Sequence, residues 1–211
     1  MDRIVAQFHA EQDDDLNLCL ADGVAYQRDQ TQLVSYDDSY FNKCAGYAGS
    51  EISQKLHQGR VAFVDAYLKH QPVVDVGIGA GEFIKARHLT WGVDVNPTAI
   101  RWLRQNRLWA DDLAGFKGYT FWDVIEHCPD PGEYLGQIGT NALAYFSIPV
   151  FDDLRQIRKS KHYRPGEHLY YWTRTGFISW MSYHGFQMIE RSDFESRAGR
   201  ESIGSFAFRR V

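Results

Sequence analysis

Three glycines at alternate positions, Gly77, Gly79 and Gly81, follow a short apolar segment that contains Asp75. Because glycine has no Cβ, this strip of main chain lets a ligand come close. A helix that begins after the glycines would point its free N–H groups at the same ligand. The pattern therefore predicts a strand, a glycine loop and a helix that together bind a nucleotide-like cofactor.

The spacing of these glycines separates two kinds of cofactor. The dinucleotide pattern G-x-G-x-x-G, counted from Gly77, would need a third glycine where this chain has Glu82. A carboxylate at that position would face a pyrophosphate, so a nicotinamide oxidoreductase is the weakest interpretation. The pattern D-x-G-x-G-x-G instead suits a cofactor that carries an ammonium, a ribose and a sulfonium.

A second acidic residue, Asp94, ends the next apolar segment, and Val95 follows it directly. Asn96 and Pro97 then have the sequence of a helix N-cap with proline at the first helical position. In a doubly wound sheet this strand tip lies beside the glycine loop, where a carboxylate can accept both hydroxyls of a ribose. The alternative is that Asp94 is only a polar residue at the end of a strand.

Two later segments place acids and histidines beside aromatic runs. The chain reads D-x-x-E-H-x-x-D-P from Asp123 to Pro131, and E-H-L-x-x-W-T from Glu167 to Thr173. With these segments and the two glycine-phenylalanine pairs at 176–177 and 185–186, the chain resembles the class I S-adenosylmethionine-dependent methyltransferases of the small-molecule type. The motifs span residues 73–186 in the order typical of that family.

The resemblance implies S-adenosylmethionine as the cofactor, with S-adenosylhomocysteine as its product. Asp123 would bind the methionine ammonium, and Arg60 would reach the methionine carboxylate unless it is an ordinary surface arginine of a helix. Tyrosines of the segment 36–49 are candidates for a lid over the sulfonium through cation–π contact, with a plain surface loop as the alternative. The complete set of expected cofactor contacts is Asp75, Gly77, Gly79, Gly81, Asp94, Val95, Asp123, Tyr47 and Arg60.

The resemblance also implies the fold. It predicts an α/β protein with a Rossmann-like, doubly wound sheet of seven strands, an antiparallel last strand, and three layers in the order α/β/α. The length of 211 residues and a hydrophobic content of 44% suit one core. We expect residues 1–50 to form a loosely packed N-terminal cap or lid and residues 51–211 to form the methyltransferase domain.

Hydrophobic spacing locates several of the elements. Residues 51–68 have apolar side chains at helical intervals, with Ile52 and Tyr67 among them, which predicts a helix before the first strand. A buried strand is expected over 142–150 and a helix over 174–184. The stretches 186–194 and 202–209 alternate like two late strands, whereas 36–49 shows no period.

Methyl transfer from a sulfonium needs the acceptor held about 3 Å from the methyl carbon, and a base helps if the acceptor is a hydroxyl. His127 and His168 are the candidate catalytic residues. His127 could instead cap local backbone, and the aromatic run after His168 suggests a pocket wall. The three cysteines have no C-x-x-C spacing, so we expect reduced thiols and neither a disulfide nor a metal site.

Charge and hydropathy limit the partners. The net charge of -4 gives no global basic surface, and no apolar run reaches about eighteen residues, so the sequence predicts a cytoplasmic protein without a membrane partner. Residues 155–164 form a local basic cluster that is either a solvated face or an anion-binding surface.

The leading interpretation is an enzyme that methylates a small or anionic molecule, with the acceptor atom and the oligomeric state left open. Nucleic acid or a nucleotide held by the basic cluster is a possible acceptor that the overall charge does not favour. A protein that binds S-adenosylmethionine without catalysis is the second alternative.

Overall fold

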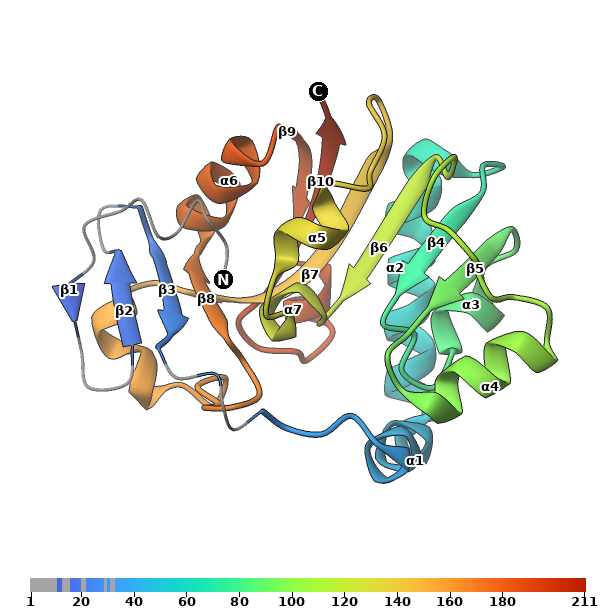
Figure 1. The fold of residues 1–211 in the computed structure, drawn as a ribbon, viewed down its shortest axis with the longest axis horizontal. Coiled ribbons are helices and arrows are strands. Elements are labelled where there is room, and N and C mark those ends of the chain that lie inside the picture. The colour runs from blue at the N-terminus through green and yellow to red at the C-terminus, as the bar shows by residue number, and fades with distance from the viewer. Residues whose placement is uncertain (1–10, 13–15, 20–21, 29, 31–32) are drawn as a thin grey trace.

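The computed structural model describes residues 11–12, 16–19, 22–28, 30 and 33–211. They form a twisted sheet with helices on both faces, as Figure 1 shows. The strands are β1 (Glu11–Gln12), β2 (Leu16–Cys19), β3 (Val24–Gln27), β4 (Val73–Val76), β5 (Thr90–Val93), β6 (Gly118–Trp122), β7 (Leu143–Phe151), β8 (Tyr170–Thr173), β9 (Phe186–Ser192) and β10 (Ile203–Arg210). The helices are α1 (Asp38–Tyr47), α2 (Glu51–Leu68), α3 (Glu82–Ala86), α4 (Pro97–Gln105), α5 (Pro131–Leu135), α6 (Arg174–Tyr183) and α7 (Phe194–Arg197), with 3₁₀ helices η2 (Ile125–His127) and η3 (Leu154–Lys159).

The centre of the sheet has the expected doubly wound order. Strands β5, β4, β6 and β7 are neighbours and run parallel. Strand β10 pairs antiparallel with both β7 and β9, so it is the antiparallel last strand that the sequence predicted. Beyond β5, a single parallel bridge between Gly92 and Trp109 takes the place of a seventh strand.

A second group of strands extends the sheet and was not predicted. The last two residues of β7, Val150 and Phe151, pair with the end of β8, and β3 then adds antiparallel to β8. Strands β2 and β1 continue this extension outward. The segment that we expected to be a loosely packed cap thus contributes β3, whose four residues are all buried.

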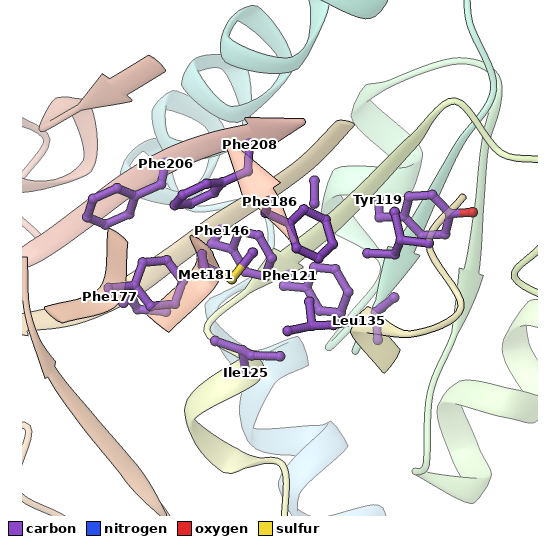
Figure 2. Close-up of a cluster of buried hydrophobic side chains, with 14 of the residues drawn as sticks. Tyr119, Phe121, Ile125, Leu135, Phe146, Phe177, Met181, Phe186, Phe206 and Phe208 are labelled. Atoms are coloured by element: carbon purple, nitrogen blue, oxygen red, sulfur yellow. The ribbon is translucent and has the colours of Figure 1, made fainter. Parts of the chain in front are cut away.

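The core lies between the sheet and the helices of each face. Helices α5 and α6 cover one face, while α2 and α7 cover the other. Phe146 of β7 is central on the α6 side, where its ring centroid lies 4.9 Å from that of Phe121, 5.5 Å from that of Phe177 and 5.8 Å from that of Phe208 (Figure 2). Full burial of each such ring contributes about 1.5–3 kcal/mol.

Helix α2 confirms the predicted bounds but not the whole predicted apolar face. Phe63 is buried as expected, together with Val64 and Leu68. Ile52 and Tyr67, two of the apolar positions from which the helix was predicted, are exposed, with 69% and 46% of their surface accessible. The buried face also contains Arg60, which the apolar pattern could not indicate.

The segment 36–49 was expected to be aperiodic but contains the helix α1. The other predicted elements appear as β7, α6, β9 and β10. Much of the expected cap, at residues 1–10, 13–15, 20–21, 29 and 31–32, lies outside the described part of the chain. None of the helices described is long and apolar enough to cross a membrane.

Candidate functional site

A cavity of about 360 Å³ opens at the carboxyl ends of β4, β5 and β6. This edge of a doubly wound sheet is where such folds bind ligands. The cavity is lined by Tyr36, Phe41, Val76, Gly77, Gly79, Val93, Asp94, Val95, Asn96, Trp122, Asp123, Val124, His127, Cys128, Pro129 and Tyr134. Two motif segments far apart in the sequence therefore meet the glycine loop around one space.

The glycine loop has the conformation that its sequence predicts. Gly77, Gly79 and Gly81 have φ angles of 73°, 55° and 74°, in the left-handed region that favours glycine. A Cβ on Gly77 would also lie 2.6 Å from a methyl group of Val124. Gly77 and Gly79 line the cavity, whereas Gly81 is the N-cap residue of α3.

Asp94 joins the second strand tip to the glycine loop. Its carboxylate accepts a hydrogen bond from the Asn96 amide at 2.7 Å and also interacts with the amides of Ile78 and Gly79. Burial raises the pKa of Asp94, and these amides oppose the rise. Asn96 caps α4 with Pro97 at its start, as predicted. Asp94 and Val95 both line the cavity.

Asp123 lies at the tip of β6 with a φ of 58° and faces the cavity. Its two carboxylate oxygens accept hydrogen bonds from Arg60 at 3.0 Å and from Arg200 at 2.8 Å. Burial alone would raise the pKa of Asp123, but the two guanidinium groups outweigh it and hold the pKa well below its usual range. Asp123 is therefore a carboxylate at neutral pH.

Arg60 does not line the cavity in this structure. Its Nε donates to Glu195 at 2.8 Å, and its guanidinium lies 4.9 Å from the Trp122 ring centroid. Burial would lower the pKa of Arg60, but Glu195 and Asp123 raise it. Arg60 thus holds Asp123 in place, and its direct contact with the methionine carboxylate stays a prediction.

Another expected contact lies apart from the cavity wall. Asp75 is only 1% exposed, and its carboxylate accepts a hydrogen bond from Thr120 Oγ1 at 2.6 Å. Burial raises the pKa of Asp75 to about 7. Tyr47 is the last residue of α1, and its side chain is not among those the structure describes.

The two candidate catalytic histidines lie edge to face, with ring centroids 4.7 Å apart. His127 lines the cavity, and its Nδ1 lies 2.8 Å from both the Tyr36 hydroxyl and the Glu167 carbonyl oxygen. His168 is behind it and only 4% exposed. Burial lowers the pKa of both imidazoles, to about 3 for His168, so both are neutral at pH 7.

The aromatic run after His168 is not the pocket wall that we expected. Tyr170, Tyr171 and Trp172 belong to β8, are at most 1% exposed, and do not line the cavity. Their rings fill the core because β8 is an interior strand between β7 and β3. Cys128 does line the cavity, and burial raises the pKa of its thiol to about 12, so it is a neutral thiol at pH 7.

Sequence reasoning missed Glu195 and Arg200. Both belong to the connection between β9 and β10, yet Arg200 reaches Asp123 from 77 positions away. No local pattern marks a contact of that length. Tyr36 and Phe41, by contrast, belong to the segment singled out as a lid, and both line the cavity.

The basic cluster at 155–164 is partly neutralised. Lys161 pairs with Glu201 at 2.9 Å, and Arg164 pairs with Glu167 at 3.1 Å. The Arg158 guanidinium lies 5.5 Å from the Tyr163 ring centroid. This arrangement favours a solvated surface over a site for phosphates.

The fold and cavity together define a class of protein. A doubly wound sheet with a glycine loop and acidic strand tips around one cavity is an α/β domain that binds a nucleotide-like cofactor at the carboxyl edge of its sheet. Residues 46–191 match the protein family described as methyltransferase domain. The chain therefore belongs to this family.

Solved structures show the same fold at low sequence identity. A methyltransferase of Thermotoga maritima, described as a possible histamine N-methyltransferase, has a TM-score of 0.59 and 13% identity over 82% of this chain and 97% of its own. Magnesium protoporphyrin IX methyltransferase of Synechocystis, with bound S-adenosylhomocysteine, has a TM-score of 0.55 and 15% identity over 82% of this chain and 94% of its own. The 1,6-didemethyltoxoflavin N1-methyltransferase of Burkholderia thailandensis, also with S-adenosylhomocysteine, has a TM-score of 0.53 and 15% identity over 89% and 96%. No curated protein matches the chain significantly.

Proposed function

We propose that this protein binds S-adenosylmethionine in the cavity and transfers its methyl group to a small-molecule acceptor. The observation that carries the proposal is the meeting of Gly77, Gly79 and Asp94 around one space. Bare main chain and a carboxylate at a neighbouring strand tip are the groups that a nucleoside cofactor needs. Two of the structures with the same fold hold S-adenosylhomocysteine, which supports this choice of cofactor.

Asp94 takes the ribose hydroxyls in this proposal, and Asp123 takes the methionine ammonium. The paired arginines keep Asp123 charged, as binding an ammonium requires. The part of the cavity lined by His127 and Tyr36 would then be left for the acceptor. The acceptor binds there, and its attack on the methyl carbon breaks the carbon–sulfur bond and leaves S-adenosylhomocysteine.

The cavity favours a small acceptor. Its volume lies at the lower end of the roughly 300–1,000 Å³ typical of ligand pockets. The ion pairs of Lys161 and Arg164 do not favour a nucleic-acid acceptor. Small-molecule methylation is therefore the function that the site supports best.

Calorimetry with S-adenosylhomocysteine tests the cofactor. We expect micromolar binding to the wild type and, for Asp94→Ala, affinity lower by about 10- to 100-fold, because hydrogen bonds to a charged group are worth about 1.5–3 kcal/mol. The exposed Asp111→Ala is the matched control and keeps wild-type affinity. Preference for NADH, or unchanged affinity in Asp94→Ala, would contradict the proposal. Release of S-adenosylhomocysteine with a panel of small acceptors then tests turnover.

A further inference from the structure

Glu126, His127 and His168 bring one carboxylate and two imidazoles together beside the cavity. One ligating atom from each lies within 4.8 Å of the others. Glu126 and His127 belong to η2, and His168 lies just before β8. The cluster is buried, since Glu126 is 1% and His168 4% exposed.

These groups lack the hydrogen-bond donors that buried acceptors need. Among the described residues, no other residue donates a hydrogen bond to either carboxylate oxygen of Glu126, whose own backbone amide interacts with it weakly, and His168 Nδ1 has no partner. Buried polar groups are nearly always hydrogen-bonded. Two such groups in one cluster point to a ligand that interacts with both.

The hydrogen bonding of His127 leaves a lone pair on its Nε2 atom. The Glu167 carbonyl oxygen can only accept a hydrogen bond, so its 2.8 Å contact requires a proton on His127 Nδ1, and the Tyr36 hydroxyl at 2.8 Å from the same nitrogen then accepts from it as well. In the neutral imidazole, Nε2 then carries a lone pair, and it lies 4.0 Å from Glu126 Oε1. A backbone carbonyl that accepts from the far nitrogen is the usual support of a metal-binding histidine.

A proton shared between Glu126 and His127 does not fit this separation. A hydrogen bond would need about 2.7–3.0 Å between the two atoms, not 4.0 Å. The midpoint of that separation lies about 2 Å from both atoms, which is a metal–ligand bond length. A cation at that point would neutralise Glu126, whereas burial of an unpaired carboxylate is costly.

We propose that Glu126, His127 and His168 bind one divalent transition-metal ion in the wall of the cavity. Imidazole ligands favour ions such as Zn²⁺, Fe²⁺ and Co²⁺ over Mg²⁺ and Ca²⁺. Neighbouring ligand atoms of a tetrahedral ion lie about 3.4 Å apart, so the atoms that now lie within 4.8 Å of one another close by up to about 1.5 Å on binding. Three protein ligands leave further coordination positions open.

The open positions face the cavity because His127 lines it. This step rests on the proposed methyl transfer: the ion would bind the oxygen of an acceptor hydroxyl and lower its pKa, as metal ions do for bound water. The hydroxyl proton passes to solvent, the oxygen bonds to the methyl carbon, and the carbon–sulfur electron pair returns to sulfur. The inferred acceptor is therefore an alcohol or phenol.

This site was not predicted from the sequence, where the lack of C-x-x-C spacings was the reason to expect no metal site. Glu126 and His127 were recognised only as part of a family motif. His168 lies 41 positions beyond His127, so no local spacing links the three residues. The pairing of β7 with β8 places His168 behind η2. The Leu169 amide also donates to the Glu126 carbonyl at 2.7 Å, which fixes the two segments side by side.

Cobalt binding tests the inference without cofactor or acceptor. Protein freed of metal by chelation is titrated with Co²⁺ and followed by visible absorption and by the metal-to-protein ratio. We expect one Co²⁺ per chain, and an affinity at least about tenfold lower in Glu126→Gln and in His168→Asn. The exposed Glu133→Gln and His70→Asn are matched controls that keep wild-type affinity. Circular dichroism of each variant verifies that it is folded.

The outcomes separate this inference from the proposed function. Absence of stoichiometric Co²⁺ binding, or unchanged affinity in the folded Glu126→Gln and His168→Asn variants, would overturn the metal site even if S-adenosylhomocysteine binds. Metal binding without cofactor binding would leave the site standing and remove the methyl transfer. Azide binds to open coordination positions of Co²⁺, so it should shift the visible absorption of the wild-type cobalt complex. If the absorption does not shift, the ion is closed to the cavity and cannot bind the acceptor hydroxyl.

Discussion

The Tyr36 hydroxyl lies 2.8 Å from His127 Nδ1, although 91 positions separate the two residues. Their rings meet edge to face with centroids 5.9 Å apart. Both line the cavity, so this contact joins the segment before α1 to η2. Tyr36 thus forms part of the cavity wall.

Loss of the Tyr36 hydroxyl should weaken cofactor binding without unfolding the protein. Tyr36→Phe keeps the ring and removes the hydrogen bond, which is worth about 0.5–1.5 kcal/mol. We expect calorimetry to show affinity for S-adenosylhomocysteine lower by about two- to tenfold. Tyr183→Phe, at an exposed position of α6, is the control and should bind as the wild type does. Equal affinity in both variants would mean that Tyr36 does not help to close the cavity.

A methyl group on Gly77 should damage both the loop and its ligand binding. Gly77 has a φ of 73°, and its added Cβ would lie 2.6 Å from Val124. The strained backbone alone costs about 1–2 kcal/mol, and Val124 must also move. We expect Gly77→Ala to lower the urea midpoint and to abolish measurable S-adenosylhomocysteine binding.

Gly139→Ala is the matched control for that substitution. Gly139 has no positive φ, and an added Cβ there has no atom within 4 Å among the described residues. The control should be as stable as the wild type and bind the cofactor normally. Equal behaviour of the two alanine variants would show that the glycine loop tolerates a side chain and does not approach a ligand closely.

Glu195 should be essential for stability because two arginines depend on it. It is fully buried and accepts from Arg60, from Arg200 and, at 2.5 Å, from Ser147 Oγ. Glu195→Gln leaves two guanidinium groups with Asp123 as the remaining carboxylate of this network. Breaking a buried ion pair on one side costs about 3–5 kcal/mol.

Urea unfolding of Glu195→Gln measures this cost. Glu133→Gln, an exposed change of the same kind, should stay within about 0.5 kcal/mol of the wild type. If both variants unfold at the same urea concentration, the network is not a source of stability. The orientation of Asp123 would then depend on β6 alone.

The fold could be predicted largely because its signals are local. The glycine loop, the Asn96 cap and the hydrophobic period of 174–184 each depend on neighbours in the sequence, and the structure has them as predicted. The extension by β8 and β3 depends on pairing between segments about 150 residues apart, which no local pattern encodes. Strand β3 was hidden in a stretch whose other residues are mostly polar.

In the site, too, some residues could be predicted from the sequence and others could not. Asp94 was predicted from its place at a strand tip beside the glycine loop and Asp123 from the family resemblance, and both line the cavity. The alternative that Arg60 is an ordinary surface arginine was wrong, because its side chain is buried against Glu195, which comes from a connection near the other end of the chain. A side chain that spans several ångströms can reach many partners, so sequence position fixes its partner poorly.

Asp75 should make the stability of the protein depend on pH in a way that one substitution removes. Burial raises its folded pKa to about 7, whereas an unfolded aspartate has a pKa of about 3.9. Between these values the folded state holds a proton that the unfolded state has lost, so the free energy of unfolding falls as pH rises. The fall can reach about 1.4 kcal/mol per pH unit and ends above the folded pKa. Asp75→Asn cannot ionise and still accepts the Thr120 hydrogen bond, so its stability relative to the wild type should increase from pH 5 to pH 7 and then level off.

Urea unfolding at pH 5, 6, 7 and 8 measures this, with the exposed Asp111→Asn as the control that keeps the wild-type slope. A difference between Asp75→Asn and the wild type that stays constant over this range would show that Asp75 is already ionised in the folded protein, with Arg60 as the nearby charge that stabilises it.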